Sequence, residues 1–449
     1  MDQYWNPELE TRPWADVLAW QHERATTLVD DLHARSEFYR SKLEGQLGSG
    51  GAGDRRPPLR ELPLTTKDEL REAQADDLRG RPLGAQQAVD LERVIQFVSS
   101  SGTTGRPVFY GLTGADQAAW ADGVANTFFT AGIRPDDVVA HLVSLPIVAG
   151  GFSYAIGFQR IGAAVAWVGG LPPERMLSSL VALQASAVLS TTSFAVYLTD
   201  HSERLAGRPA WQLGVHKIIG GGEPGLGEPE IREKVIAGWR TNHVRETMGL
   251  GDVLSSMWAE CDDGSGMHFN AQAHVLVELM DPDTLQPVPW RDGATGEAVY
   301  TTLGREATPV LRFRSADHLV VTGTSCRCGR TSPKIRCIGR TDDMLIYKGM
   351  NVFPTALRDV IMRRFSDAVE PYLRVWKDRS EQVQFDSPIP LDVEAQPSLD
   401  AQLYSGLASR IEEAVRANLQ VRVAVSVVPA GSIPRTAYKT PLVHVREPH

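Results

Sequence analysis

The sequence is poor in cysteine, contains no long apolar run and carries no block of basic residues. Four cysteines among 449 residues are too few for the disulfide framework of a small secreted domain. No apolar run approaches the ~18 residues that span a bilayer, and the first ten residues lack the basic and apolar regions of a signal peptide. These absences predict a cytoplasmic protein that is not inserted in a membrane.

The charge balance narrows the choice of partners. The net charge is −9, and the basic residues are not clustered. A protein that binds an extended nucleic acid presents a basic face to the phosphates, so we expect no nucleic acid partner. Small anionic ligands stay compatible with this composition, because a few local donors can bind them.

The order of apolar patterns predicts an α/β protein with more than one domain, since 449 residues exceed the size of a single hydrophobic core. Residues 15–46 have the spacing of amphipathic helices. Between residues 93 and 320, short β-branched runs first alternate with helical patterns and later follow one another closely. This predicts a mainly parallel sheet with covering helices and an antiparallel subdomain. The pattern restarts after residue 340 as a smaller α+β unit, in which residues 378–400 are predicted to be a loop.

The stretch Ser99–Pro107, SSSGTTGRP, is a candidate phosphate-binding loop. It is not a Walker A loop, because Gly102 and Gly105 are only three residues apart and Pro107 has no N–H for a continuing helix. Its small residues can turn backbone N–H groups toward an anion, and Arg106 adds a fixed charge. A strand-like segment follows, so the loop is expected to join two strands. By composition alone, a solvated hairpin explains the stretch equally well.

Four residues form a candidate metal site. Cys261 and His268 flank a glycine-containing turn, and Cys326 and Cys328 follow later. Three sulfurs and one imidazole suit a closed tetrahedral Zn²⁺ site, although the C-x-C spacing is tighter than the usual C-x-x-C. Buried free thiols beside a surface histidine are the alternative. Cys337 is predicted to be a spare core thiol.

Several motifs together resemble the phenylacetate-CoA ligase family of the adenylate-forming superfamily. Besides SSSGTTGRP they are, in the family's order, YWNPELE, LPLTTKDEL, GGGEP, GREATPVLRFRSAD, CRCGRTSPKIRCIGRTDDMLIYKGMNVFP and PRTAYK. The likeness covers nearly the whole chain and includes the Cys/His set. It implies a large N-terminal domain, residues 1–341, and a small mobile C-terminal domain, residues 342–449, that rotates about Asp342.

The resemblance also implies a reaction and its cofactors. The protein is expected to join an aryl acid to ATP as an acyl adenylate, releasing pyrophosphate, and then to form a coenzyme A thioester, with Mg²⁺ and structural Zn²⁺ bound. The implied catalytic residues are Lys439, Asp252, which also holds Mg²⁺, and Arg340. The implied ATP or AMP contacts are Ser100, Ser101, Gly102, Thr103, Thr104, Gly105, Glu223, Pro224, Met248, Gly249, Asp317 and Arg340.

The chain departs from the family in two places. The family motif Y-G-x-T-E aligns with MGLGD, where Met248, Gly251 and Asp252 replace an aromatic, a threonine and a glutamate. In the segment that forms the family's aryl pocket, Val143 and Val148 stand where phenylacetate-type members carry aromatics. The implied acyl contacts are Val143, Val148, Gly221, Gly222 and Leu250.

These departures leave more than one function open. A substituted benzoate, with an amino or hydroxyl group as in natural-product pathways, fits the sequence as a substrate as well as an arylacetate does. Apolar pockets discriminate single groups by only ~1–3 kcal/mol. An enzyme that passes the acyl group to an amine or hydroxyl, and a degenerate nucleotide-binding protein, are the alternatives. The sequence also leaves open whether the protein is a homodimer.

Overall fold

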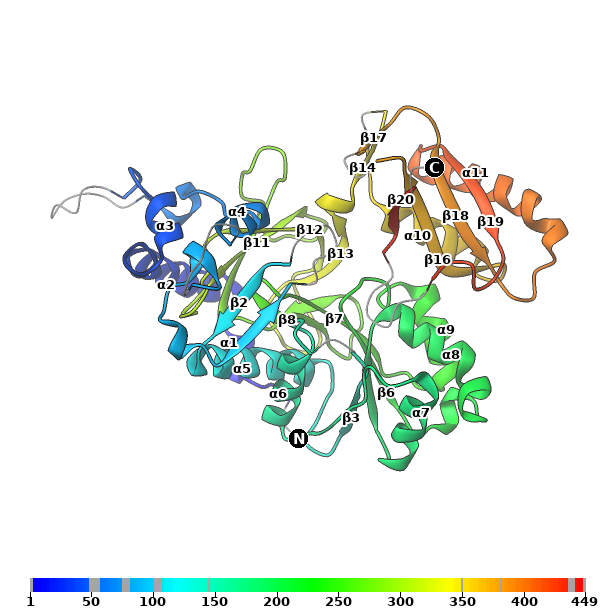
Figure 1. The fold of residues 1–449 in the computed structure, drawn as a ribbon, viewed down its shortest axis with the longest axis horizontal. Helices are drawn as coiled ribbons and strands as arrows, with labels where there is room; N and C mark the ends of the chain where they lie inside the picture. Colours follow the sequence, from blue (N-terminus) through cyan, green and yellow to red (C-terminus); the bar gives the residue numbers. More distant parts are fainter. Residues whose placement is uncertain are drawn as a thin grey trace.

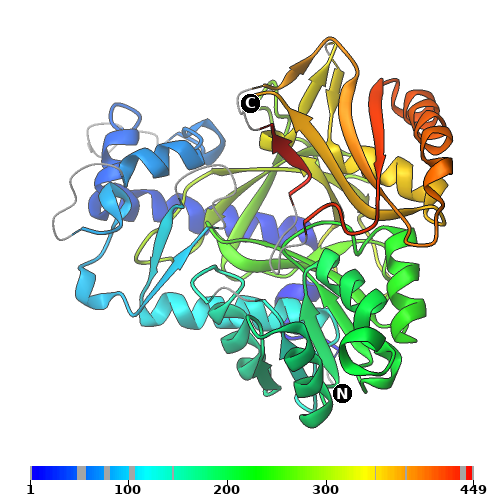
Figure 2. The same cartoon turned by 45° about the vertical axis from the view of Figure 1, so that its right-hand side comes forward.

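The computed structural model describes residues 3–47, 57–74, 81–100, 107–143, 146–348, 350–379, 382–434 and 441–446, without the side chains of Asp342 and Asn351. A large body comprises the chain up to residue 340. A smaller body, yellow-orange to red in Figure 1, follows it and lies against one side of the large one (Figures 1 and 2).

An 11-stranded sheet runs through the large body. Its order is β10 (Val275–Met280), β11 (Thr295–Thr302), β12 (Phe313–Gly323), β13 (Lys334–Arg340), β9 (Met267–Phe269), β8 (Leu254–Glu260), β7 (Val244–Leu250), β6 (Lys217–Gly220), β5 (Ala187–Ser190), β3 (Val138–His141) and β4 (Ala164–Trp167). Strand β7 pairs in parallel with β6 and antiparallel with β8. The predicted parallel and antiparallel parts are therefore two halves of one sheet that meet at β7.

Helices cover both faces of the parallel half. Val139 of β3 packs in the cluster formed with α5 and α6, whereas its neighbour Ala140 packs in the cluster formed with α7, α8 and α9. Burial on both faces explains why these strands are continuous apolar runs in the sequence. The helices are α5 (Gly114–Thr130), α6 (Phe152–Ile161), α7 (Pro173–Ala182), α8 (Thr192–Ala206) and α9 (Pro229–Trp239).

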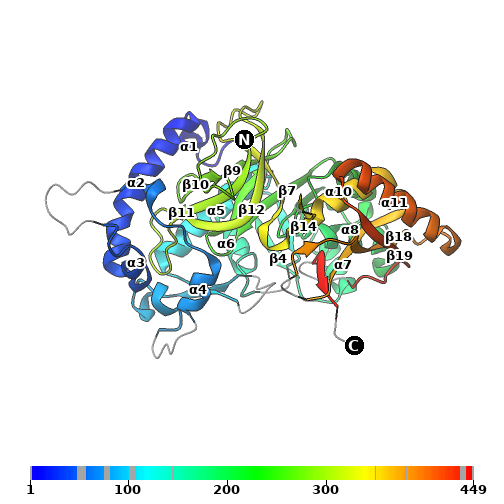
Figure 3. The same ribbon diagram turned by 90° about the horizontal axis from the view of Figure 1, so that it is seen from above.

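The predicted N-terminal helices pack against the antiparallel half, where Leu32 and Tyr39 share a buried cluster with Leu276 (Figure 3). The helices before the sheet are α1 (Pro7–Thr11), α2 (Trp14–Arg35), α3 (Glu37–Lys42) and α4 (Lys67–Ala73). The short 3-10 turns of the large body are η1 (Leu59–Glu61), η2 (Gly84–Gln86), η3 (Leu91–Arg93) and η4 (Ala210–Gln212).

A separate two-stranded ribbon flanks the candidate phosphate loop. Strands β1 (Gln96–Ser99) and β2 (Phe109–Leu112) pair antiparallel, with Ser99 opposite Phe109. The loop therefore connects two paired strands, as the sequence predicts. Residues 101–106 themselves lie outside the described residues.

The smaller body has its own hydrophobic core. A four-stranded sheet has the order β19–β18–β16–β20 and a three-stranded one the order β15–β14–β17. The elements are η5 (Thr341–Asp343), β14 (Leu345–Tyr347), β15 (Met350–Val352), α10 (Pro354–Phe365), β16 (Val369–Lys377), β17 (Gln384–Phe385), β18 (Ile389–Ala395), η6 (Ala401–Leu403), α11 (Tyr404–Leu419), β19 (Val423–Val428) and β20 (Val443–Val445).

The prediction of a loop over residues 378–400 is wrong, because β17 and β18 lie within it. Strand β18 pairs with both β16 and β19, which makes it a central strand. The charged residues of β18 make it resemble a loop in the sequence. In the fold they have partners: Asp392 accepts hydrogen bonds from Arg374 Nη2 at 3.0 Å and from the Trp376 indole at 2.8 Å. Among helices of the described residues, none is both long enough and apolar enough to cross a bilayer.

Candidate functional site

A cavity lies between the two bodies, at the carboxyl ends of the parallel strands. Open α/β sheets bind ligands at this edge, because the loops that leave the strands there diverge around a crevice. Residues after β5, β6 and β7 line it from the large body, and α10 lines it from the small one. Of the predicted site residues, the wall contains Ser100, Val143, Gly221, Gly222, Glu223, Pro224, Met248, Gly249, Leu250, Asp252, Asp317 and Arg340.

Several other predicted residues are not described. Ser101–Gly105 and Lys439 lie outside the described residues, and Asp342 is placed only by its backbone, in η5. Pro441 and Leu442, which follow Lys439 closely in the chain, both line the cavity. The end of the chain therefore returns to the large body at this site.

The segment after β6 is tied to the start of α8. Ser193 donates from its backbone N and from Oγ to Glu223 Oε1, each at 2.5 Å. Before this glutamate, a Cβ on Gly221 would stand 2.8 Å from Thr247 Oγ1 of the neighbouring strand. Only glycine lets the backbone approach β7 this closely, so this wall of the cavity is bare backbone.

Asp317 and Arg340 form an ion pair on adjacent strands of the wall. The two residues are register partners on β12 and β13, and Arg340 Nη1 lies 2.7 Å from Asp317 Oδ1. Ala316 has a φ of +63°, a conformation that costs a non-glycine residue free energy. This local strain directly precedes Asp317, whose side chain is almost fully buried.

Asp252 is the centre of a buried polar cluster that sequence reasoning missed. Tyr110 donates its hydroxyl to Asp252 Oδ1 at 2.5 Å, and Lys67 Nζ lies 3.5 Å from both carboxylate oxygens. Arg305 Nη1 donates to the Asp252 carbonyl at 2.9 Å. Burial, with the negative charge of Asp252, raises the pKa of Tyr110 well above its usual value, so the phenol is the donor.

Gly251 packs directly on the start of the candidate phosphate loop. A Cβ at this position would lie 3.0 Å from Ala149 Cβ and 3.5 Å from the Ser99 carbonyl oxygen. The first contact is tighter than ordinary packing and the second is an ordinary van der Waals contact, so a side chain at residue 251 would require Ala149 to shift slightly. The hydroxyl that the threonine would supply is absent from this wall.

The apolar part of the wall is built from Val143, Leu250 and Tyr154. Tyr154 is held in place by a hydrogen bond from its hydroxyl to the Ser255 carbonyl at 2.9 Å. Val148 is buried and forms an isolated bridge with Ser99; among the described residues, it is not part of the cavity wall.

The four predicted zinc ligands converge at a second place. The ligand atoms of Cys261, His268, Cys326 and Cys328 all lie within 4.8 Å of one another. His268 Nδ1 donates to the Ser332 carbonyl at 2.9 Å, which leaves Nε2 directed at the sulfurs, 3.4 Å from Cys328 Sγ. A ring nitrogen oriented in this way by a backbone carbonyl is typical of metal-bound histidine.

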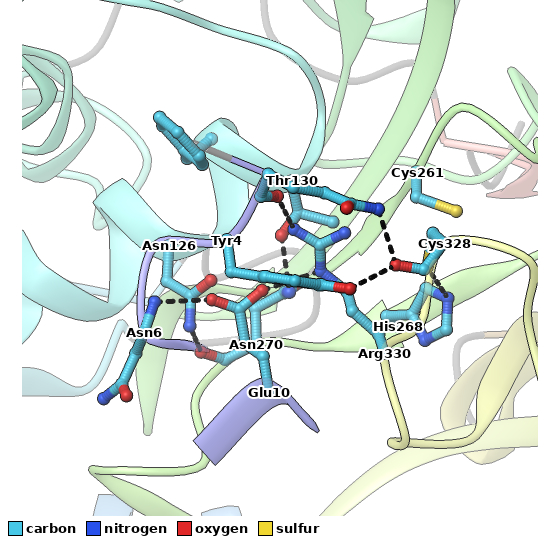
Figure 4. A network of polar contacts seen from close by, with 12 residues as sticks. Tyr4, Asn6, Glu10, Asn126, Thr130, Cys261, His268, Asn270, Cys328 and Arg330 are labelled. Carbon is cyan, nitrogen blue, oxygen red and sulfur yellow. Dashed lines mark hydrogen bonds and ion pairs between the residues drawn. The ribbon is translucent and has the colours of Figure 1, made fainter. Parts of the chain in front are cut away.

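The N-terminal segment closes over the loop that carries two of these ligands (Figure 4). Gln3 Nε2 and Tyr4 Oη donate to the Cys328 carbonyl at 2.8 and 2.9 Å. Arg330 forms an ion pair of 2.7 Å with Glu10, and both side chains are almost completely buried. Thus the first described residues of the chain hold a loop more than 300 residues away.

Polar contacts join the two bodies beside the cavity. Lys234 of α9 lies 2.9 Å from Glu370 of β16, and Tyr372 donates its hydroxyl to the Ser193 carbonyl at 2.9 Å. Because Ser193 also binds Glu223, this contact connects β16 of the small body to the part of the cavity wall that the large body forms.

An acidic group is buried at the same interface. Burial, together with the nearby Glu228 and Glu230 of the large body, raises the pKa of Asp359 on α10 to about 7, although Arg358 and Arg363 act to lower it. The usual value is 3.8. The folded protein therefore binds a proton at Asp359 more tightly than the unfolded chain does, and this group makes folding less favourable as the pH rises from about 4 to about 7.

Asp359→Asn is therefore expected to stabilise the protein at pH 8, by roughly 1–3 kcal/mol after allowance for partial exposure. The gain should grow between pH 4 and pH 7 and stay constant above, because the amide does not ionise. Thermal unfolding at pH 4.5 and pH 8 measures it, with Asp367→Asn, an exposed position just beyond α10, as the control. An equal gain at both pH values would contradict the prediction.

Comparison with known proteins places the chain in a family. The model for the AMP-binding enzyme C-terminal domain matches residues 349–445. The phenylacetate-coenzyme A ligase of Thermus thermophilus is 31% identical over 96% of this chain and 97% of its own length. The phenylacetate-coenzyme A ligase of Escherichia coli K12 is 27% identical over 96% of this chain and 95% of its own.

Solved structures agree in fold and in domain arrangement. A crystal structure of 2-hydroxyisobutyryl-CoA ligase in the postadenylation state is 25% identical, covers 99% of this chain and 93% of its own, and has a TM-score of 0.86. The structure of the same enzyme in the thioesterification state is 26% identical and covers 99% of this chain and 92% of its own. Its TM-score is 0.69. The chain as a whole is therefore more similar to the postadenylation structure than to the thioesterification structure. With a relative 31% identical over nearly its full length, the chain belongs to the phenylacetate-CoA ligase family of adenylate-forming enzymes and is an AMP-forming acid–CoA ligase.

Proposed function

We propose that this protein activates an aryl carboxylic acid, a substituted benzoate or an arylacetate, with ATP and transfers the acyl group to coenzyme A. One observation carries the proposal. A single cavity between the two bodies gathers Glu223, the Asp317–Arg340 pair and Asp252 from separate strands and the loops that follow them. The relatives named phenylacetate-coenzyme A ligase, and the neighbour solved with 2-HIB-AMP, support the same chemistry.

The nucleotide is proposed to bind along this wall. Asp317 would accept hydrogen bonds from the ribose hydroxyls, and Arg340, held by Asp317, would stand beside the ribose and phosphate. Glu223 and Pro224 would flank the adenine, on which Met248 can pack with its polarisable thioether. Ser100 and the following residues up to Gly105 would bind the β- and γ-phosphates.

Asp252 is the proposed Mg²⁺ ligand. Magnesium in nucleotide sites is held by one or two carboxylates together with substrate phosphates and water, and the Asp252 carboxylate on the cavity wall could serve as such a ligand. The bound ion would neutralise phosphate charge. Tyr110 and Lys67 orient the carboxylate from the protein side.

The reaction is proposed to use both domains, residues 1–341 and residues 342–449, with Asp342 as the hinge. A carboxylate oxygen of the acid attacks the α-phosphorus, the bond from that phosphorus to the bridging oxygen breaks, and pyrophosphate leaves with the electron pair. Lys439 would stabilise the charge that develops. After the small domain rotates, the thiol of coenzyme A loses its proton to solvent and attacks the acyl carbonyl, and AMP leaves.

The aryl group is proposed to lie between the bare backbone at Gly221 and Gly222 and the side chains of Val143, Leu250 and Tyr154. Glycine on one side admits a flat ring against the backbone. The valine leaves more room than the aromatic residue found in phenylacetate-type members, which favours a ring with a substituent.

A zinc ion is proposed to be bound by Cys261, His268, Cys326 and Cys328. The donor set fits, because three sulfurs and one imidazole nitrogen already lie within 4.8 Å of one another. Four protein ligands leave no position for a substrate, so the ion would be structural and would fix the antiparallel half of the sheet beside the cavity.

The proposed function is tested with the purified full-length protein, ATP and a panel of benzoates and arylacetates. Acid-dependent exchange of labelled pyrophosphate into ATP reports the first step, and mass spectrometry of the coenzyme A thioester reports the second. Exchange with an aryl acid and formation of its thioester are expected. AMP formation without thioester for every acid would show a different acceptor, and no exchange with any acid would overturn the proposal.

A further inference from the structure

Two basic side chains of α4 line the cavity, and neither has so far been assigned a contact with the substrates. Lys67 and Arg71 are one helical turn apart and therefore lie on the same face of the helix. Both line the cavity, and their side chains are 28% and 25% exposed. Lys67 lies next to Asp252 in space, although 185 residues separate the two in the chain, and Arg71 lines the same cavity.

The distance between Lys67 and Asp252 leaves the ammonium group able to bind a second anion. Nζ lies 3.5 Å from both oxygens of Asp252, too far for a strong hydrogen bond. The carboxylate itself is 1% exposed and already accepts the Tyr110 hydroxyl. Because an ammonium group has three donors and this one is partly exposed, it can also donate to an anion in the cavity.

The helix that carries these cations is firmly anchored. A capping box joins Thr66 and Glu69 at its start. The preceding residue, Thr65, donates its backbone N–H to the Arg312 carbonyl at 2.9 Å and accepts from Arg314 N at 2.8 Å. The charges are therefore held in place before a ligand arrives, which is the condition for strong electrostatic stabilisation.

Arg71 also forms an ion pair with Asp68 of the same helix, whose side chain is exposed. The other two described basic residues of the wall form contacts with the large body away from α4. Arg340 pairs with Asp317 at 2.7 Å, and Arg358 donates to the Pro224 carbonyl at 3.1 Å. Both contacts lie on the proposed nucleoside side. Lys67 instead lies beside Asp252, the residue proposed to sit nearest the phosphates, and Arg71 lines the same cavity one helical turn further along α4.

We propose that Lys67 and Arg71 bind the pyrophosphate group as it leaves the α-phosphorus. This inference rests on the proposed function. As the bond from the α-phosphorus to the bridging oxygen breaks, the electron pair stays on that oxygen, and the extra negative charge on pyrophosphate is compensated by the two cations. No proton transfer is needed. The ammonium group also supplies a hydrogen-bond donor near Gly251, where the family's threonine hydroxyl is missing.

The test measures the exchange of pyrophosphate into ATP by the full-length protein and its variants Lys67→Met, Lys67→Arg and Arg71→Gln. Each neutral variant should raise the KM for pyrophosphate by about tenfold or more, the effect of losing a charge-assisted hydrogen bond, with the KM for the acid unchanged. Lys67→Arg keeps the charge and should stay closer to the wild type. Arg60→Gln, whose side chain is 68% exposed, is the control and should match the wild type.

Arg71→Gln separates binding of pyrophosphate from support of Asp252, because Arg71 is not the residue that contacts this carboxylate. If Lys67→Met does not fold by thermal unfolding, Lys67→Arg and Arg71→Gln still decide the question through titration with methylenediphosphonate, a stable pyrophosphate analogue. A wild-type KM for pyrophosphate in Arg71→Gln, or a rise confined to the KM for the acid, would overturn the inference. Absence of exchange in the wild type with every acid would overturn the proposed function instead.

Discussion

Purified protein is expected to contain about one zinc ion per chain, and Cys326→Ser is expected to lose it and to unfold at a temperature at least about 5 °C lower. The loss follows from geometry, since the four ligand atoms lie within 4.8 Å of one another. Without the ion, thiolates and an imidazole that are partly or fully buried would face one another without a cation, and the loop from residue 326 to residue 330 would lose its anchor to β9.

Elemental analysis and thermal unfolding measure this result. Cys337→Ser is the matched control, because Cys337 lies on the cavity wall and outside the cluster of four ligands. It should keep the metal. Metal well below one equivalent in the wild type, or an unchanged metal content in Cys326→Ser, would contradict the prediction.

Lys439→Ala is expected to slow acyl-adenylate formation by about two to three orders of magnitude, the cost of removing a preorganised donor from a developing charge. Pro441 and Leu442 line the cavity, which brings this end of the chain close to the proposed α-phosphate position. Acid-dependent pyrophosphate exchange measures the effect.

The rate of thioester formation, the second half-reaction, is compared with the rate of adenylate formation in the same variant. Thioester formation from a preformed acyl adenylate should proceed in Lys439→Ala at close to the wild-type rate, because the small domain has then rotated away. Arg416→Ala, an exposed position on α11, should leave both steps intact. Equal losses in the two half-reactions of Lys439→Ala would show a structural role for this lysine instead.

The fold was predicted well where local pattern and global structure agree. The parallel strands are continuous apolar runs because both faces are buried, and the helices around them have clear periodicity. Strand β18 was missed because Pro390, Asp392 and Glu394 resemble loop residues. Their partners come from distant segments: Glu394 accepts hydrogen bonds from the backbone N–H groups of Gly431 and Ile433. The local sequence pattern does not show that residues distant in the chain will form hydrogen bonds with these polar side chains.

In the candidate site, too, some residues could be predicted from the sequence and others could not. Asp252, Asp317 and Arg340 were predicted from motifs, and the structure brings them to one cavity. Lys67 and Tyr110 were not singled out, because their relation to Asp252 exists only after α4 and the β1–β2 ribbon fold against the end of β7. The convergence of the four metal ligands was predicted from their donor types together with the family resemblance, and the structure brings their ligand atoms together.

The contact of the N-terminal segment with the metal loop has a consequence for folding. Gln3 and Tyr4 leave the ribosome well before their partner, the Cys328 carbonyl, which is synthesised more than 300 residues later. Contacts of such long sequence separation form late, because the loop-closure entropy is lost before they can contribute. The contacts of Gln3 and Tyr4 with the metal-binding loop can therefore form only after nearly the whole large body has been synthesised.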